Sequence, residues 1–172
     1  MLAPASSPTS LLERLRGATR ARHEALDQSV DVSTVDAYRR FLTASYAAVA
    51  GIETQLATST ERTDALRADL AELSASTPDA LTMTLADSPS ARLGATYVVE
   101  GSALGGMVLA ERVSGFTTAT RFLRLRGKET AARWRAFLAT LDGVRDEEAC
   151  ITAACATFDH YARAFRMHQV VA

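Results

Sequence analysis

The most informative segment of this chain reads Leu93-Gly-Ala-Thr-Tyr-Val-Val-Glu-Gly-Ser-Ala-Leu-Gly-Gly-Met-Val-Leu109. Its apolar pattern predicts a helix, yet Gly101, Gly105 and Gly106 lie inside it. Each interior glycine lowers helix stability by about 0.5–1 kcal/mol relative to alanine, so the three together cost about 2–3 kcal/mol. This is a large share of the roughly 5–15 kcal/mol by which a folded domain is stable. The absence of side chains at these three positions must therefore have another reason than helix stability.

Two explanations for these glycines stay open on the sequence alone. Gly101 and Gly105 are four residues apart and share one helix face, and Ser102 and Gly106 form the adjacent row. Small residues at this spacing allow another helix backbone to pack closely. In the alternative, a flat ligand or a diatomic molecule lies against bare backbone and the helix kinks there.

A second informative segment is Leu15-Arg-Gly-Ala-Thr-Arg-Ala-Arg-His-Glu-Ala-Leu-Asp27. His23 follows Thr19 by four residues and precedes Leu26 by three, so we expect it on the same buried side as the leucines. Asp27 lies one turn later and can hold one imidazole nitrogen, which leaves the other free for a metal. A lone inward histidine is more often a hydrogen-bonded core residue. The segment is locally basic through Arg14, Arg16, Arg20 and Arg22.

The whole sequence predicts an all-α, single-domain bundle, because little period-two alternation of β-branched residues occurs. Residues 1–9 are expected to form a flexible segment and residues 10–172 a helical domain. The expected helices cover residues 10–28, 35–57, 61–73, 79–85, 90–113, 117–125, 128–141 and 146–168.

Composition narrows the classes of protein further. The 172 residues are 48% hydrophobic and 23% charged, as in globular proteins. A net charge of −1 gives no basic surplus for nucleic acid. The sequence shows no secretory signal and no long apolar run, so we expect no membrane segment and a cytoplasmic location. Cys150 and Cys155 are about 140° apart on a helix, which favours free thiols over a disulfide.

Together the two segments resemble the heme oxygenase family, most closely the bacterial biliverdin-producing members that accompany bacteriophytochromes. Residues 15–27 look like the proximal helix of the family. Residues 97–106 look like its distal helix, and the two occur in the right order. The resemblance extends from about residue 10 to residue 168 and implies a fold in which heme b lies between these helices.

The resemblance assigns roles to the first helix. His23 matches the axial iron ligand, and Asp27 matches a position, often glutamate, that lies near the proximal imidazole. Arg16 and Arg20 match basic positions near the heme propionates. Thr19, which directly precedes Arg20, is assigned to the same heme-binding set.

The resemblance also assigns roles to the distal and last helices. Gly101 and Gly105 match the glycines that approach bound dioxygen, and Gly106 adjoins them on the heme side. Arg163 and Arg166 are the candidates for completing the propionate clamp. These assignments imply that the heme is held between an imidazole and side-chain-free backbone.

The implied activity is oxidative cleavage of heme to biliverdin, with release of carbon monoxide and ferrous iron. The reaction consumes dioxygen and electrons, and the chain has no flavin or nicotinamide fingerprint, so a separate donor such as a ferredoxin or reductase is expected. A bacteriophytochrome is a further candidate partner, as a user of the product.

One residue departs from the family. Many heme oxygenases place aspartate directly after the first distal glycine, where it organises waters that deliver protons, whereas this chain has Ser102. A serine hydroxyl can hold a water because it both donates and accepts.

The alternative function is a heme-binding carrier or sensor that does not catalyse. A di-iron or thiamin-degrading relative of the fold has little support, because no Glu-x-x-His pair accompanies the three histidines. A purely structural helical adaptor is a further alternative. His160 and His168 are interpreted as surface or partly buried structural residues.

Overall fold

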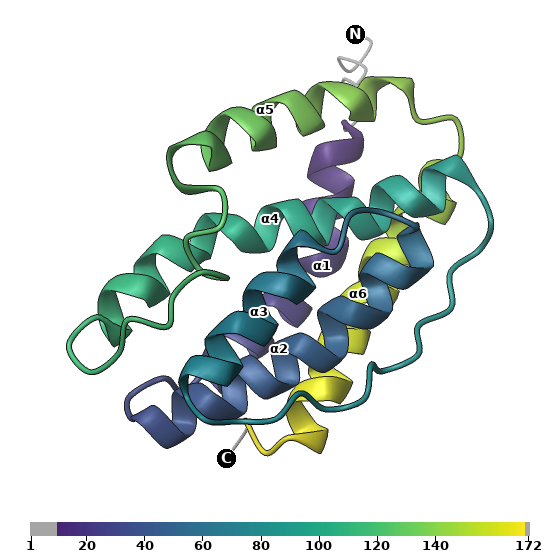
Figure 1. Ribbon diagram of the computed structural model, residues 1–172. Helices are drawn as coiled ribbons and strands as arrows, with labels where there is room; N and C mark the ends of the chain where they lie inside the picture. The colour runs from purple at the N-terminus through teal and green to yellow at the C-terminus, as the bar shows by residue number, and fades with distance from the viewer. Residues whose placement is uncertain (1–9, 171–172) are drawn as a thin grey trace, which may run out of the picture.

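The computed structural model describes residues 10–170, which form an all-α bundle with no strand in that range (Figure 1). The predicted flexibility of residues 1–9 lies outside the described residues. The six α-helices are α1 (Leu11–Ser29), α2 (Val35–Leu56), α3 (Glu61–Glu72), α4 (Pro89–Val113), α5 (Thr130–Thr140) and α6 (Glu147–Met167). Two short 3₁₀ turns, η1 (Gly127–Glu129) and η2 (Leu141–Gly143), flank α5.

Local sequence signals explain where the helices begin. Ser10 and Glu13 form a capping box, in which each side chain accepts a hydrogen bond from the other residue's backbone N–H. Thr34 caps α2 through its hydroxyl. Ser88 caps α4 in the same way, and Pro89 occupies the first turn, where its missing N–H costs nothing.

The helix predicted over residues 79–85 is wrong. Residues 75–86 form an irregular strap that joins α3 to α4, the long connection at the right of Figure 1. Its backbone bonds to α2 instead of to itself, since the Leu81 N–H donates to the Ala47 carbonyl at 2.8 Å. A side chain at Gly51 would overlap the Leu81 carbonyl oxygen, so this glycine permits the close approach of strap and helix.

The helix predicted over residues 117–125 is also wrong. Residues 121–126 form successive turns. The N–H groups of Arg121 and Phe122 donate to the fully buried carboxylate of Asp69 on α3, at 3.0 and 2.9 Å. These two donors are thus satisfied by a side chain distant in sequence. The backbone bonds that follow, from Arg124 to Thr120 and from Leu125 to Phe122, mix two spacings and form turns rather than a regular α-helix.

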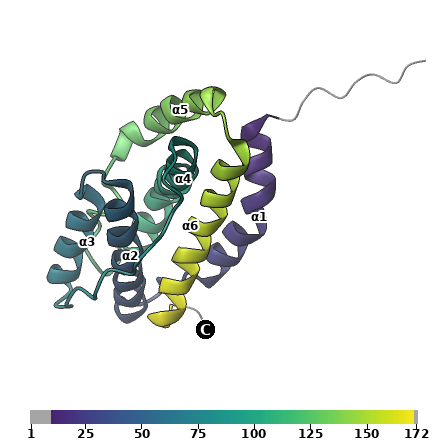
Figure 2. The same cartoon turned by 90° about the vertical axis from the view of Figure 1, so that its right-hand side faces the viewer.

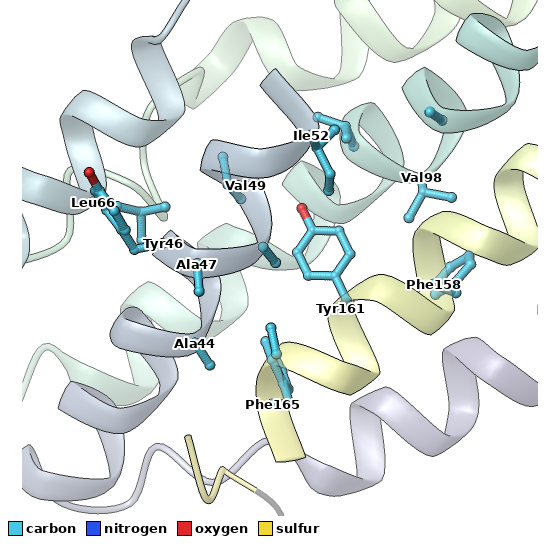
Figure 3. Packing of buried hydrophobic residues seen from close by; sticks show 14 of the residues in the cluster. Ala44, Tyr46, Ala47, Val49, Ile52, Leu66, Val98, Phe158, Tyr161 and Phe165 are labelled. Carbon is cyan, nitrogen blue, oxygen red and sulfur yellow. The ribbon is translucent and has the colours of Figure 1, made fainter. Parts of the chain in front are cut away.

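α6 is the central packing element of the bundle. It lies against α1, α2 and α4 (Figure 2). At its contact with α4, a side chain at Gly94 would overlap the Cys150 carbonyl oxygen, so the two backbones touch there. The core between the helices is apolar and includes Ile52, Leu66, Val98, Phe158, Tyr161 and Phe165 (Figure 3).

α4 has a property that the sequence interpretation did not anticipate. By length and composition it could cross a membrane, with a mean hydropathy of 1.3 over an 18-residue window, 39% of which is buried in the structure. The Gly94 contact joins α4 to α6 within the bundle. The expectation that no segment spans a membrane stays a prediction.

Two other sequence interpretations have clear outcomes. Cys150 and Cys155 are both free thiols, as predicted, and Cys150 is buried. The interpretation of His160 as a surface or partly buried residue is wrong, because the structure buries it in the bundle with its Nε2 3.1 Å from the Ala48 carbonyl oxygen. Burial lowers the pKa of His160, Arg163 lowers it further, and the bond to Ala48 opposes both.

The lowered pKa of His160 makes stability depend on pH. The unfolded chain binds the proton more readily than the folded protein, so this contribution to stability is lost as pH falls from about 6.5 through the lowered folded pKa. We expect the free energy of unfolding, measured with urea, to decrease between about pH 7.5 and pH 5.5. His160→Gln keeps a donor for Ala48 but does not titrate, so its decrease should be smaller. An equal decrease in both proteins would contradict this assignment.

Candidate functional site

A cavity of about 630 Å³ lies between α1, α4, α6 and the 122–126 segment. This volume falls within the range of about 300–1,000 Å³ typical of small-molecule sites. The apolar part of its lining includes Leu26, Val30, Phe41, Val98, Leu104, Val108, Leu109, Phe122, Phe158 and Phe165. Leu104 and Val108 are exposed, so the cavity presents apolar surface to the medium.

The α1 side of the cavity carries His23 and Asp27. The Nδ1 atom of His23 lies 2.9 Å from an Asp27 carboxylate oxygen, and the imidazole meets the Phe158 ring edge-on, at 5.8 Å between ring centroids. Because the carboxylate holds Nδ1, Nε2 is the nitrogen left to coordinate a metal or accept a hydrogen bond.

The expected burial of His23 is wrong. Its side chain is 59% exposed, because it faces the open cavity rather than the packed side of α1 that holds Leu15 and Thr19. An exposed imidazole fixed by a carboxylate is available to a ligand. A histidine hydrogen-bonded inside the core, the more common role of a lone inward histidine, would not be available in this way.

The α4 side of the cavity is formed by Gly101, Ser102, Gly105 and Gly106. A side chain at Gly106 would place its Cβ 2.5 Å from the Leu123 carbonyl oxygen, so close backbone packing explains this glycine. At Gly105 an added Cβ would meet no atom of the described residues within 4 Å, and at Gly101 it would only touch the Trp134 ring at 3.6 Å. Close packing thus explains Gly106, although its partner is the turn segment at Leu123 rather than a second helix. Gly105 faces open space, and a ligand against it stays a prediction. α4 stays α-helical throughout, and the predicted kink stays a prediction.

Five predicted site residues lie outside the cavity lining. Thr19 is buried and its hydroxyl donates to the backbone of its own helix. Arg16, Arg20 and Arg166 are exposed, and Arg163 donates to the strap carbonyl of Thr82. The structure does not bring these residues together with the cavity, and their proposed contact with a ligand stays a prediction.

The sequence interpretation missed the cationic residues that do line the cavity, which are Arg62, Arg112 and Arg126. Arg62 donates to Glu100 at 2.7 Å, and both side chains are 13% exposed. Arg126 forms an ion pair with Glu61, and its Nε is buried without a hydrogen-bond partner among the described residues. No local pattern marked these arginines. Packing of α3 and of the 121–126 turns brings Arg62 and Arg126 to the cavity, whereas Arg112 reaches it from the last turn of α4.

The tyrosine at position 161 was also missed. Tyr161 lines the cavity from α6, between Phe158 and Phe165 in sequence. It is part of an apolar stripe at helical spacing, which by itself predicts only a core residue.

Over residues 10–170, histidine, cysteine and carboxylate side chains form no group of three or more that could hold a metal ion. The di-iron alternative therefore gains no support from the described part of the chain.

The sequence of this chain is similar to that of a known protein. No protein-family model matches it. It is 33% identical over 145 residues to a heme oxygenase of Xanthomonas campestris pv. campestris, a match that includes 73% of this chain and 87% of that protein.

The glycines of α4 give a prediction about stability. Gly105→Ala should raise the free energy of unfolding of the ligand-free protein by about 0.5–1 kcal/mol, because alanine favours the helix and its methyl group meets no atom. Gly106→Ala is the matched control and should lower it, because the methyl group would clash with Leu123. Urea denaturation measures both. A loss of stability in Gly105→Ala would show that the protein itself needs this glycine for packing.

Proposed function

The chain belongs to the heme oxygenase family, and from that premise we propose that it cleaves heme to biliverdin with release of carbon monoxide and ferrous iron. The observation that carries the proposal is the pairing, across one cavity, of a carboxylate-held imidazole with a helix face that lacks side chains.

The residues of the cavity fit a heme. The macrocycle is large, flat and apolar, and the cavity supplies an apolar lining of suitable volume. One imidazole nitrogen is free for iron, since Asp27 holds the other. Gly105 leaves space where any other residue would place a side chain.

Heme, when bound, supplies the dioxygen chemistry, and the protein contributes binding, orientation and electrostatics. His23 would hold the iron through Nε2, and Asp27 would accept the Nδ1 proton, fix the ring orientation and increase the basicity of the ligand. Gly101 and Gly105 would keep the α4 side of the cavity open for a small molecule. The apolar lining would limit the water that reaches the reacting atoms.

Several finer features belong to the same proposal. Electrons would come from a separate donor such as a ferredoxin or reductase, and a bacteriophytochrome would be one user of the product. We also propose that the protein is cytoplasmic and that it belongs to the bacteriophytochrome-associated subgroup. Arg16 and Arg20 are exposed on the helix that carries His23, and a heme whose carboxylates reach out of the cavity along α1 would meet them.

The first test is heme binding. Hemin should form a one-to-one complex with the spectrum of a histidine-ligated heme, and His23→Ala should abolish that spectrum by removing the nitrogen that faces the cavity. His168→Ala is the control, because His168 lies outside the cavity lining and should leave the spectrum unchanged. An unaltered spectrum in His23→Ala would refute the assignment of the ligand.

The second test separates an enzyme from a carrier or sensor. Reduction of the heme complex in air should bleach the Soret band and yield a green bilin, identified by chromatography. A heme that survives many reduction cycles intact would instead support the non-catalytic alternative.

A further inference from the structure

The cavity has a second polar side, formed by α3, α4 and α6 rather than by α1. Arg62, Ser102 and Tyr161 reach the cavity from these helices. Among the largely apolar lining, they bring two hydroxyl groups and one guanidinium to the same region. The question is which of them can donate a hydrogen bond to a ligand.

Tyr161 carries a phenol whose ring is buried and whose hydroxyl has polar neighbours. Figure 3 shows its side chain directed from α6 toward Ile52 of α2, between Val49 and Val98. Burial raises the pKa of Tyr161 to about 12, Arg62 and the Ser102 hydroxyl act to lower it, and Glu53 raises it. The phenol therefore keeps its proton at neutral pH and can donate it in a hydrogen bond.

Ser102 does not have a free proton to offer. Its hydroxyl donates to the Val99 carbonyl of its own helix at 2.9 Å. A hydroxyl whose hydrogen is engaged in this way can still accept through its oxygen. Of the two neighbouring hydroxyl groups, Tyr161 is therefore the one able to donate.

Arg62 is fixed beside this pair by two carboxylates. Its guanidinium donates to Glu100, which directly precedes Gly101 in α4. Its backbone N–H and that of Thr63 donate to the buried Glu53 carboxylate, each at 3.2 Å. Because its guanidinium and its backbone are both held, Arg62 keeps one position at the cavity wall.

Resting on the proposed function, we infer that Tyr161 is the hydrogen-bond donor to a small anion or water-sized ligand bound on the α4 side of the cavity, with Arg62 as the residue that positions this polar wall. Tyr161 thus supplies the donor that Ser102 cannot provide. A phenol O–H can be directed toward a ligand by rotation about its C–O bond alone. Ser102 remains an acceptor for a proton carried by a ligand or water.

Fluoride binding to the ferric heme complex tests this inference with a readout other than turnover. Fluoride is a small anion whose affinity depends on nearby hydrogen-bond donors. Tyr161→Phe removes one hydroxyl and should weaken fluoride binding about tenfold or more, the effect of a hydrogen bond to a charged group. Ser102→Ala should weaken it less, because its proton is already engaged.

The matched control is Tyr97→Phe. Tyr97 also lines the cavity, but its ring packs against Trp134 in a tilted arrangement, at 5.6 Å between ring centroids. This variant should bind fluoride nearly as the parent protein does. If Tyr161→Phe and Tyr97→Phe bind fluoride equally well, Tyr161 is not the donor.

The outcomes separate this inference from the proposed function. Failure of the parent protein to bind hemin would overturn both, whereas hemin binding with fluoride affinity indifferent to Tyr161 would overturn the inference alone.

A second measurement, vibrational spectroscopy of the fluoride complex, uses the parent protein and does not depend on the folding of any variant. The iron–fluoride stretching frequency should shift in deuterated water if a hydroxyl donates to fluoride, and an unshifted frequency would overturn the inference.

Discussion

α4 is held at two places by contacts of backbone against backbone, and the site depends on them. Gly94 meets the Cys150 carbonyl of α6, and Gly106 meets the Leu123 carbonyl of the 122–126 segment. Any side chain at either position would force the neighbouring element away from α4. Between these contacts, Gly101 and Gly105 form a face without side chains, and Gly105 borders open space. The helix is thus fixed on both sides of the stretch that remains available to a ligand.

Buried carboxylates hold the elements that surround this helix. Asp69 is fully buried and accepts from the backbone of Arg121 and Phe122, which keeps the next residue, Leu123, against α4. Glu53 likewise accepts from backbone N–H groups at the start of α3, from which Arg62 reaches the cavity. A buried carboxylate without partners would be strongly destabilising, so these bonds both satisfy the charge and fix the cavity walls.

Short-range patterns account for what could be predicted from sequence. The pairing of His23 with Asp27 follows from helical spacing, and the glycines of α4 were recognisable because they oppose the local propensity for helix. The 79–85 and 117–125 segments were predicted wrongly because their backbone partners, Ala47 and Asp69, lie far away in sequence. The same limit hid Arg62 and Arg126, whose position at the cavity depends on how α3 and the 121–126 turns pack.

The central claim is that a macrocycle lies between His23 and the bare face of α4. Titration of the ¹⁵N-labelled protein with zinc protoporphyrin, a diamagnetic stand-in for heme, tests it by nuclear magnetic resonance. The account predicts the largest shifts at the His23 imidazole and at the amides of Gly101 and Gly105, with the His160 ring, buried outside the cavity lining, little changed. Saturable binding that leaves His23 and both glycine amides unshifted would contradict it.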